Sequence, residues 1–334
     1  MRTRQLGNTD LQLTTIGLGT WAIGGGDWKF GWGDQNENDA VAAIVRAVEL
    51  GVNWIDTAAV YGNGRSEELV ARALVELGPE RRPIVATKCG RVIQEDGSIS
   101  GIIKHESVIA ECEASLRRLG VETIDLYQMH WPQPDEDIEE AWQTMLDLQQ
   151  QGKVRHIGVS NHSAAQMERL RAISPIVSLQ PPYSMLNRGI EEEILPYCGR
   201  NQISVVCYSP MGKGLLTGAF TTERAASLSD EDHRSKDPKF KEPQLAINLA
   251  LVDGLRPIAQ RNGRTLAQLA IAWVLRRDEV TSAIVGARRP EQIEQTVAAG
   301  DWELTGEEIA EIDELLTRRD TALIEAGALD QGRV

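Results

Sequence analysis

Eight apolar strand patterns alternate with helix patterns along the 334 residues of the chain, and this alternation predicts an α/β protein of the (β/α)8 TIM-barrel class. Strict alternation indicates parallel strands, because each helix returns the chain to the same end of the sheet. Eight such units favour a closed barrel over an open doubly wound sheet. The predicted strands are residues 15–19, 52–56, 83–88, 124–130, 154–160, 176–180, 203–208 and 282–286.

Other elements are expected around the barrel. Residues 2–13 alternate polar and apolar side chains around a turn-forming sequence at residues 7–10, which predicts a β-hairpin before the first barrel strand. Helical periodicity covers residues 38–50, 66–77, 106–119, 138–151, 163–172, 190–198 and 266–276, and extra helices are expected after the last strand. Ser66, Ser163 and Thr305 are predicted to cap helices, because their hydroxyl oxygens can accept a free backbone N–H.

The chain shows no linker and no low-complexity tract. A single domain is therefore expected over residues 1–334, with a barrel core of about residues 3–318 and a C-terminal tail at 319–334. One long irregular segment, residues 209–243, follows the seventh strand. Loops of this length inside a compact domain are usually functional or disordered.

The composition narrows the function classes. With 35 basic and 49 acidic residues the net charge is -14, which argues against binding to nucleic acid or to an anionic membrane. No apolar run approaches the ~20 residues that span a bilayer, and the first residues lack the apolar core of a signal peptide. The four cysteines form no C-x-x-C pair and the histidines no H-E-x-x-H motif, so no metal site is expected. A cytoplasmic monomer is the expectation.

Four polar residues stand at or just after the ends of predicted strands: Asp56, Tyr61, Lys88 and His130. A parallel barrel would bring them to one mouth. A phenol has a pKa of roughly 10 and is a poor proton donor near neutrality unless a nearby cation stabilises its anion. Lys88 could supply that cation, and Asp56 could keep it charged, an arrangement suited to protonating the oxygen of a carbonyl during reduction. An alternative takes Asp125 and His130 as metal ligands.

These residues lie in motifs that resemble the aldo-keto reductase superfamily over roughly residues 3–318, and most closely the bacterial branch that includes the general stress and inositol-utilisation reductases. The motifs are Asp56-Thr-Ala-x-x-Tyr61-Gly followed by Ser66-Glu67, Ala86-Thr-Lys88, Asp125-Leu-Tyr-Gln-Met-His130, Gly158-Val-Ser160-Asn161, Gln180-Pro-Pro-Tyr183, the run Gly214 to Gly218, Asp237-Pro-Lys-Phe240 and the run Gly286 to Gln292. The resemblance implies that Tyr61 is the general acid and base, that Lys88 and Asp56 tune it, and that His130 orients the substrate carbonyl.

The resemblance also implies a nicotinamide dinucleotide, NADP(H), bound without a Rossmann domain. The Gly17-x-Gly19-x-x-Ala22 sequence imitates a dinucleotide fingerprint, but the three glycines at 24–26 cannot form the helix that such a fingerprint opens. By resemblance, Ser160, Asn161 and Gln180 hold the carboxamide group of the nicotinamide, because an amide needs both hydrogen-bond donors and acceptors. By the same resemblance, Tyr208 stacks on the nicotinamide ring. The other implied cofactor contacts include Thr20, Trp21 and Asp56.

Two segments are expected to bind the cofactor phosphates, because phosphates need backbone N–H groups or cations. The first contains Ser209, Pro210, Met211, Lys213 and Gly214. The second begins at Gly286 and continues through Arg288 into a helix, where barrels often bind phosphate. Arg288 is predicted to bind the 2'-phosphate, assisted by Arg234, with Gln292 near the adenine; Gln295 and Thr296 occupy a region where many relatives place asparagine.

Tryptophans predict an aromatic substrate cleft. Trp21, Trp28, Trp32 and Trp131 lie in loops after the first and fourth strands. Such a cleft suits small aldehydes, dicarbonyls or sugars without selecting among them. The alternatives are an NAD(P)-dependent sugar or cyclitol dehydrogenase, a non-catalytic NADPH-sensing subunit and a metal-dependent barrel hydrolase.

Overall fold

The computed structural model describes residues 1–26, 28, 30–229 and 232–328, and its centre is a closed barrel of eight parallel strands. The barrel strands are β3 (Ile16–Gly19), β4 (Trp54–Asp56), β5 (Ile84–Cys89), β8 (Ile124–Met129), β9 (Val154–Ser160), β10 (Ser178–Gln180), β11 (Ser204–Tyr208) and β12 (Val280–Gly286). They neighbour one another in this order, and β12 closes the ring by pairing in parallel with β3. The predicted barrel class is confirmed.

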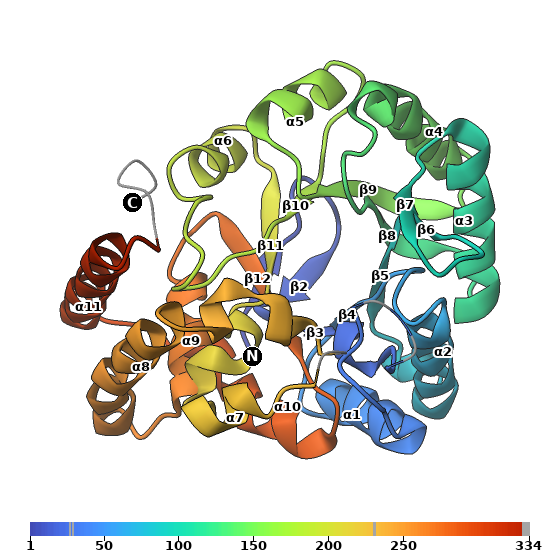
Figure 1. Cartoon of the computed structure of the whole chain (residues 1–334). Helices are drawn as coiled ribbons and strands as arrows, with labels where there is room; N and C mark the ends of the chain where they lie inside the picture. Colours follow the sequence, from blue (N-terminus) through green and yellow to red (C-terminus); the bar gives the residue numbers. More distant parts are fainter. Residues whose placement is uncertain (27, 29, 230–231, 329–334) are drawn as a thin grey trace.

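Helices form a ring around the strands (Figure 1). Those between the barrel strands are α1 (Glu37–Glu49), α2 (Arg65–Leu77), α3 (His105–Leu119), α4 (Ile138–Gln150), α5 (Ala164–Arg171), α6 (Ile194–Arg200), α7 (Thr222–Ala226), α8 (Gln244–Arg261) and α9 (Leu266–Leu275). After β12 come α10 (Pro290–Thr296) and α11 (Gly306–Glu325), and α11 packs against α8. Helix α11 includes residues 319–325 of the predicted C-terminal tail, and residues 329–334 lie outside the described part of the chain.

A hairpin closes the amino-terminal end of the barrel. It consists of β1 (Thr3–Gln5) and β2 (Gln12–Thr14), which pair antiparallel as predicted. Its buried leucines, Leu6, Leu11 and Leu13, form one apolar cluster with side chains from inside the barrel, among them Trp54 and Leu126. Burial of this apolar surface holds the hairpin against this end of the barrel, which it closes.

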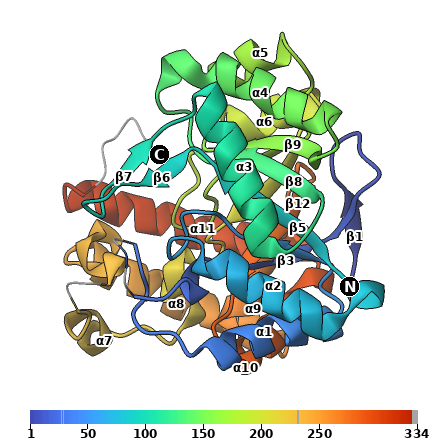
Figure 2. The ribbon, with the colours of Figure 1, turned by 90° about the vertical axis from the view of Figure 1, so that its right-hand side faces the viewer.

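The opposite end carries the irregular elements. Figure 2 shows the β6–β7 hairpin and α7 at the end of the molecule away from β1. This hairpin joins β6 (Arg91–Ile93) to β7 (Ile99–Gly101), and the segment 209–243 contains α7 and the short helices η4 (Gly212–Thr217), η5 (His233–Lys236) and η6 (Pro238–Phe240). The long segment predicted to be irregular therefore contributes short helices to the rim.

Several local predictions are corrected. Ser66 does not cap α2, whose N-cap is Gly64 with φ of 92°; the Ser66 hydroxyl instead donates to the Thr20 carbonyl and hydroxyl at 3.0 and 2.7 Å. The helix expected from residue 190 begins at Ile194, where Pro196 falls in the first turn and its missing N–H costs nothing. Helix α8 was not predicted, because Gly254 and Pro257 both read as helix breakers.

The other two capping predictions are confirmed. Ser163 and Thr305 each accept a bond from the backbone three residues later, and Gln166 and Glu308 bond back to complete capping boxes. Throughout residues 1–26, 28, 30–229 and 232–328, the helices are too short or too polar to cross a bilayer.

Candidate active site

The carboxyl ends of the barrel strands surround a cavity of about 1000 Å³. Every site residue predicted from the sequence contributes to its wall except Thr20 and Lys88, which are buried behind it. The wall therefore combines strand ends with loop residues far apart in the chain.

Asp56, Lys88 and Tyr61 form a chain of polar contacts at the base of this cavity. Asp56 ends β4, Lys88 lies in the neighbouring strand β5, and Tyr61 lies in the loop that leads to α2. The Lys88 Nζ donates to Asp56 Oδ2 at 2.7 Å and lies 3.4 Å from the Tyr61 hydroxyl. Parallel pairing of β4 with β5 brings the acid and the amine together, so the barrel itself builds the pair.

The Asp56–Lys88 pair is almost fully buried, with 3% and 1% of the two residues exposed. A buried ion pair needs further hydrogen bonds to offset the loss of hydration. Lys88 Nζ also donates to the Thr57 carbonyl at 2.8 Å, and Asp56 Oδ1 accepts from Gln180 Nε2 at 2.7 Å. Gln128 Nε2 lies 3.4 Å from the same oxygen. These contacts fix the direction in which Lys88 meets Tyr61.

The acidity of Tyr61 differs from the sequence-based expectation. Lys88 was expected to make the phenol more acidic, yet burial raises the Tyr61 pKa well above its ordinary value, and the charge of Asp56 adds to that rise. The Lys88 charge is offset by Asp56 at 2.7 Å, so the pair as a whole is close to neutral. The phenol is consequently held protonated near neutral pH.

His130 faces Tyr61 across the cavity, with ring centroids 5.8 Å apart and planes at 80°. Burial lowers the pKa of His130 well below its ordinary value, and the charges of Lys88 and Arg91 lower it further. The ring is therefore neutral near pH 7. A neutral imidazole can donate a hydrogen bond to a carbonyl oxygen without adding charge.

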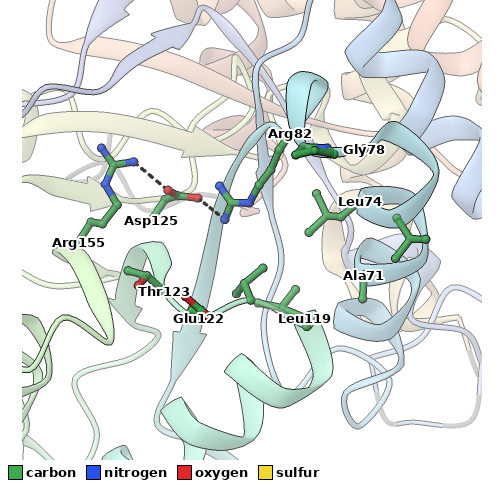
Figure 3. A pocket seen from close by; sticks show the side chains of 13 residues that line it. Ala71, Leu74, Gly78, Arg82, Leu119, Glu122, Thr123, Asp125 and Arg155 are labelled. Atoms are coloured by element: carbon green, nitrogen blue, oxygen red, sulfur yellow. Dashed lines mark hydrogen bonds and ion pairs between the residues drawn. The ribbon is translucent and has the colours of Figure 1, made fainter.

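The metal-ligand alternative for Asp125 and His130 is excluded by their positions. Asp125 lies at the start of β8, whereas His130 follows its end. Figure 3 shows Asp125 in a second cavity of about 560 Å³, between Arg82 and Arg155, whose nitrogens lie 3.0 and 2.9 Å from its carboxylate. Among the described residues no group of three or more histidine, cysteine, aspartate or glutamate side chains could hold a metal ion.

The side chains predicted for the carboxamide lie side by side. Ser160 ends β9 and pairs in register with Gln180 of β10, whose carbonyl accepts from the Ser160 hydroxyl at 2.8 Å. Asn161 follows with φ of 61°, a left-handed conformation that asparagine tolerates. Its Oδ1 accepts from the Tyr208 hydroxyl at 2.9 Å, and its Nδ2 donates to the His130 carbonyl at 3.0 Å. The wall here presents the mixed donors and acceptors that an amide requires.

The first predicted phosphate segment forms an unusual turn. Gly212, Lys213 and Gly214 are consecutive left-handed residues, with φ of 57°, 57° and 95°. Glycine adopts this conformation without strain. The N–H groups of Gly212 and Gly214 donate within the turn, to the carbonyls of Ser209 and Met211 at 2.9 and 3.1 Å. Lys213 Nζ donates to Asp237 at 2.9 Å, which ties the turn to η6.

Arg288 is engaged differently from the prediction. Its Nε donates to Gln35 Oε1 at 2.7 Å, its Nη1 donates to the Trp32 carbonyl at 3.0 Å, and its Nη2 bonds the Asp34 carbonyl. The guanidinium thus anchors the β3–α1 loop. Its backbone N–H donates to Gln292 Oε1 at 2.7 Å. Arg234, the predicted assistant, forms a bidentate pair with Asp232.

Thr20 is not brought to the cavity. Its hydroxyl is fully buried and donates to the Asp56 carbonyl at 3.0 Å. The residue links the ends of β3 and β4 beside Asp56, and the cofactor contact implied for it stays a prediction.

The predicted tryptophans form an aromatic wall together with a residue that the sequence did not indicate. Trp21 and Trp32 meet edge to face at 5.6 Å, and Trp28 lies 6.1 Å from the Tyr61 ring. His233 packs against Trp21 and Trp32 at 4.9 and 4.8 Å. Nothing in the irregular segment 209–243 marks His233 in advance. The contact joins this segment to the β3–α1 loop at the mouth of the cavity.

Arg91 was also missed, although a signal existed. It lies three residues after Lys88, just beyond the end of the same strand, and it contributes to the cavity wall. A cation at that place on a barrel strand is a candidate ligand contact by the same rule that marked Lys88.

Comparison with known proteins agrees with this geometry. The model of the "Aldo/keto reductase family" matches residues 15–317. The chain is 38% identical over 320 residues to "Aldo-keto reductase YhdN" of Bacillus subtilis (strain 168), covering 95% of this chain and 94% of that protein. It is 34% identical over 311 residues to the "NADH-specific methylglyoxal reductase" of Escherichia coli (strain K12), covering 90% and 93%.

A solved structure supports the same assignment. The glycerol dehydrogenase AKR11B4 from Gluconobacter oxydans superposes with a TM-score of 0.87 at 39% identity, covering 95% of each chain. Family match, sequence identity and fold agree over nearly the whole length. The chain belongs to the aldo/keto reductase family.

Proposed function

We propose that the protein is an NADPH-dependent reductase of small aldehydes and ketones, within the bacterial stress-reductase branch that its motifs resemble. The observation that carries the proposal is the contact chain from Asp56 through Lys88 to the Tyr61 hydroxyl, at 2.7 and 3.4 Å, beside the neutral ring of His130. This set can protonate a carbonyl oxygen as it becomes an alkoxide. A reduced nicotinamide supplies the hydride when bound.

Tyr61 is the proposed proton donor. Because burial raises its pKa, the phenol keeps its proton until a stronger base appears, and an alkoxide is a far stronger base than a phenolate. The proton then moves from the Tyr61 hydroxyl to the substrate oxygen. Lys88 Nζ, 3.4 Å away, stabilises the phenolate that remains.

His130 is the proposed orienting residue. Its ring faces Tyr61 at 5.8 Å, so a carbonyl oxygen between the two rings could accept a bond from each. Its low pKa keeps it neutral, and the Asn161 bond to its carbonyl fixes its backbone. A fixed donor needs no reorganisation when charge develops on the oxygen.

The cavity residues fit a nicotinamide dinucleotide. One side of the wall holds Ser160, Asn161 and Gln180, which suit an amide, and another holds Lys213, whose ammonium group suits a phosphate. The choice of NADPH over NADH rests on Arg288, a cation on the wall that could exchange its carbonyl partners for a phosphate. The similar Escherichia coli protein is NADH-specific by name, so both cofactors belong in the test.

The test is a panel of aldehydes, dicarbonyls and sugars followed by nicotinamide absorbance with NADPH and NADH. We expect turnover of several carbonyls, with a higher kcat/KM for NADPH. Tight NADPH binding without turnover across the panel would instead identify a sensing subunit. Turnover abolished by a chelator would contradict the metal-free mechanism.

Oxidation of a polyol or sugar alcohol is the second candidate. It is favoured by the similarity to a glycerol dehydrogenase over 95% of both chains. The same residues would act in reverse, with Tyr61 accepting the proton of the alcohol. Glycerol and a cyclitol, each with NADP+ and NAD+, distinguish this direction from reduction.

Arg288→Ala is expected to raise the KM for NADPH at least about tenfold more than the KM for NADH, because only NADPH offers a 2'-phosphate to the guanidinium. The measurement is KM for both cofactors in the wild type and the variant. Arg289→Ala, at an exposed neighbouring position, is the matched control and should change neither.

A second variant separates phosphate binding from loop anchoring. Gln35→Ala removes the partner of Arg288 Nε but leaves the charge in place, so it should affect both cofactors alike. An equal loss for both cofactors in Arg288→Ala would remove the preference for NADPH.

A further inference from the structure

We propose that Arg91 is a specificity-determining residue that binds an oxyanion, a carboxylate or a phosphate, on the carbonyl substrate. The inference rests on the proposed function and names the substrate class within it: aldehydes or ketones that carry a negatively charged group away from the reacting carbon. Neither the family assignment nor the named relatives specify such a group.

The backbone places Arg91 at the substrate end of the cavity. The strand that carries Lys88 ends at Cys89, and Gly90 turns the chain with φ of 88°. The Gly90 N–H donates to both oxygens of Glu111, each at 3.1 Å, which holds the turn against α3. Arg91 is thereby fixed at the start of the β6–β7 hairpin and on the cavity wall.

The Arg91 side chain lies against the aromatic wall. Its guanidinium carbon is 5.5 Å from the centre of the Trp131 ring, and Trp131 follows the proposed orienting residue His130 directly. Arg91 is also close enough for its charge to lower the pKa of His130. An anion bound to Arg91 would therefore belong to a substrate whose carbonyl can reach His130 and Tyr61.

The Arg91 guanidinium has N–H donors that are available to a ligand. Among the described residues, its side chain forms one hydrogen bond, from Nη1 to Gln133 Oε1 at 3.2 Å. Arginine carries five N–H donors in a planar fork. Within the described part of the chain, the Arg91 side chain contacts the neutral side chains of Gln133 and Trp131 and forms no ion pair with an acid. Arg91 is partly buried, and this burial lowers the pKa of its guanidinium. A partly desolvated cation without an acidic partner favours an anionic ligand.

Three other cations on the wall already have partners. Lys213 pairs with Asp237, Arg234 pairs with Asp232, and Arg288 is surrounded by loop carbonyls. These three lie in the segments proposed for the cofactor. In a chain of net charge -14, an uncompensated cation beside the reacting carbonyl concentrates an anionic substrate that the rest of the surface repels.

The experiment compares matched substrate pairs in the wild type, Arg91→Gln and Arg91→Lys. The carboxylate pair is 4-carboxybenzaldehyde and its methyl ester, and the phosphate pair is glyceraldehyde 3-phosphate and glyceraldehyde. The readout is the ratio of kcat/KM for the anionic member to that for the neutral member. We expect Arg91→Gln to lower this ratio roughly ten- to a hundredfold and Arg91→Lys to lower it less, because lysine keeps the charge but loses the fork.

Further measurements separate charge recognition from a packing role. Rising salt should reduce the wild-type ratio, since the contact is electrostatic and partly exposed. Arg224→Gln, which removes another cation of the wall, is the control and should leave the ratio unchanged. A fall confined to one substrate pair supports the inference and identifies the anion. Equal losses for anionic and neutral substrates in Arg91→Gln would overturn it and leave the proposed function intact.

Absence of turnover with every carbonyl compound would reject the proposed function. The role of Arg91 in anion recognition is then tested by measuring ligand binding. Tryptophan fluorescence, from rings such as Trp131 in the wall, reports occupation of the cavity. Quenching by 4-carboxybenzaldehyde should require about tenfold more ligand in Arg91→Gln, whereas quenching by the methyl ester should not shift. Identical shifts for both ligands would overturn the inference on its own.

Discussion

Tyr61→Phe is expected to lower kcat for carbonyl reduction by roughly 10²- to 10⁴-fold, the range typical of a lost general acid. The ring keeps its contacts with Trp21 and His130 at 6.5 and 5.8 Å, so the cavity wall is unchanged in shape. The affinity for the nicotinamide cofactor should therefore stay within about twofold. Single-turnover rates and cofactor titration by fluorescence measure the two quantities separately.

The control for this variant is Tyr197→Phe. Tyr197 lies on α6, and its hydroxyl donates to Glu168 at the surface at 2.7 Å. The Tyr197→Phe substitution also removes one phenolic oxygen, but at a position far from the cavity, so kcat should be unchanged. Full activity in Tyr61→Phe would reject the phenol as the proton donor.

Lys88→Met is expected to lower both turnover and stability. Methionine keeps the approximate length of the side chain but removes the charge, which leaves the Asp56 carboxylate buried without its cation. Breaking a buried ion pair in this way costs about 3–5 kcal/mol of unfolding free energy. Turnover should fall at least about a hundredfold, because the phenolate of Tyr61 loses its stabilising cation. Urea denaturation and steady-state kinetics give the two results.

A second substitution distinguishes the catalytic effect from the structural one. Asp56→Asn combined with Lys88→Met removes both charges and should recover much of the stability without recovering turnover. Lys153→Met breaks the surface pair with Glu113, also 2.7 Å long, and should cost much less stability than Lys88→Met, because water screens an exposed pair. Recovery of turnover in the double variant would show that the charge of Lys88 is not required.

The sequence was sufficient for the fold and for naming most of the predicted residues that surround the cavity. Periodicity distinguishes strands from helices over a few residues, and their alternation forces parallel pairing. Once the strands are parallel, polar residues at their ends must meet at one mouth, which is why the sequence alone groups Asp56, Lys88 and His130. The hairpin was also predicted from a short stretch, because polar and apolar residues alternate within residues 2–13.

Only the tertiary structure decided the partners of the loop residues. Arg288 binds the carbonyls of a loop more than 250 positions away, and Ser66 bonds to Thr20 rather than capping its own helix. No local pattern encodes such contacts, because they depend on how distant loops pack. His233 reached the aromatic wall for the same reason.

The charge state of the site was also decided by the fold. The sequence placed a cation near Tyr61 and suggested a more acidic phenol, but burial raises its pKa instead. The sequence by itself determined which residues stand at the mouth of the barrel, through short-range periodicity and strand direction. The tertiary structure determined how deeply each is buried and which charge neutralises which, because hydration and ion pairing depend on atoms that are distant in the chain.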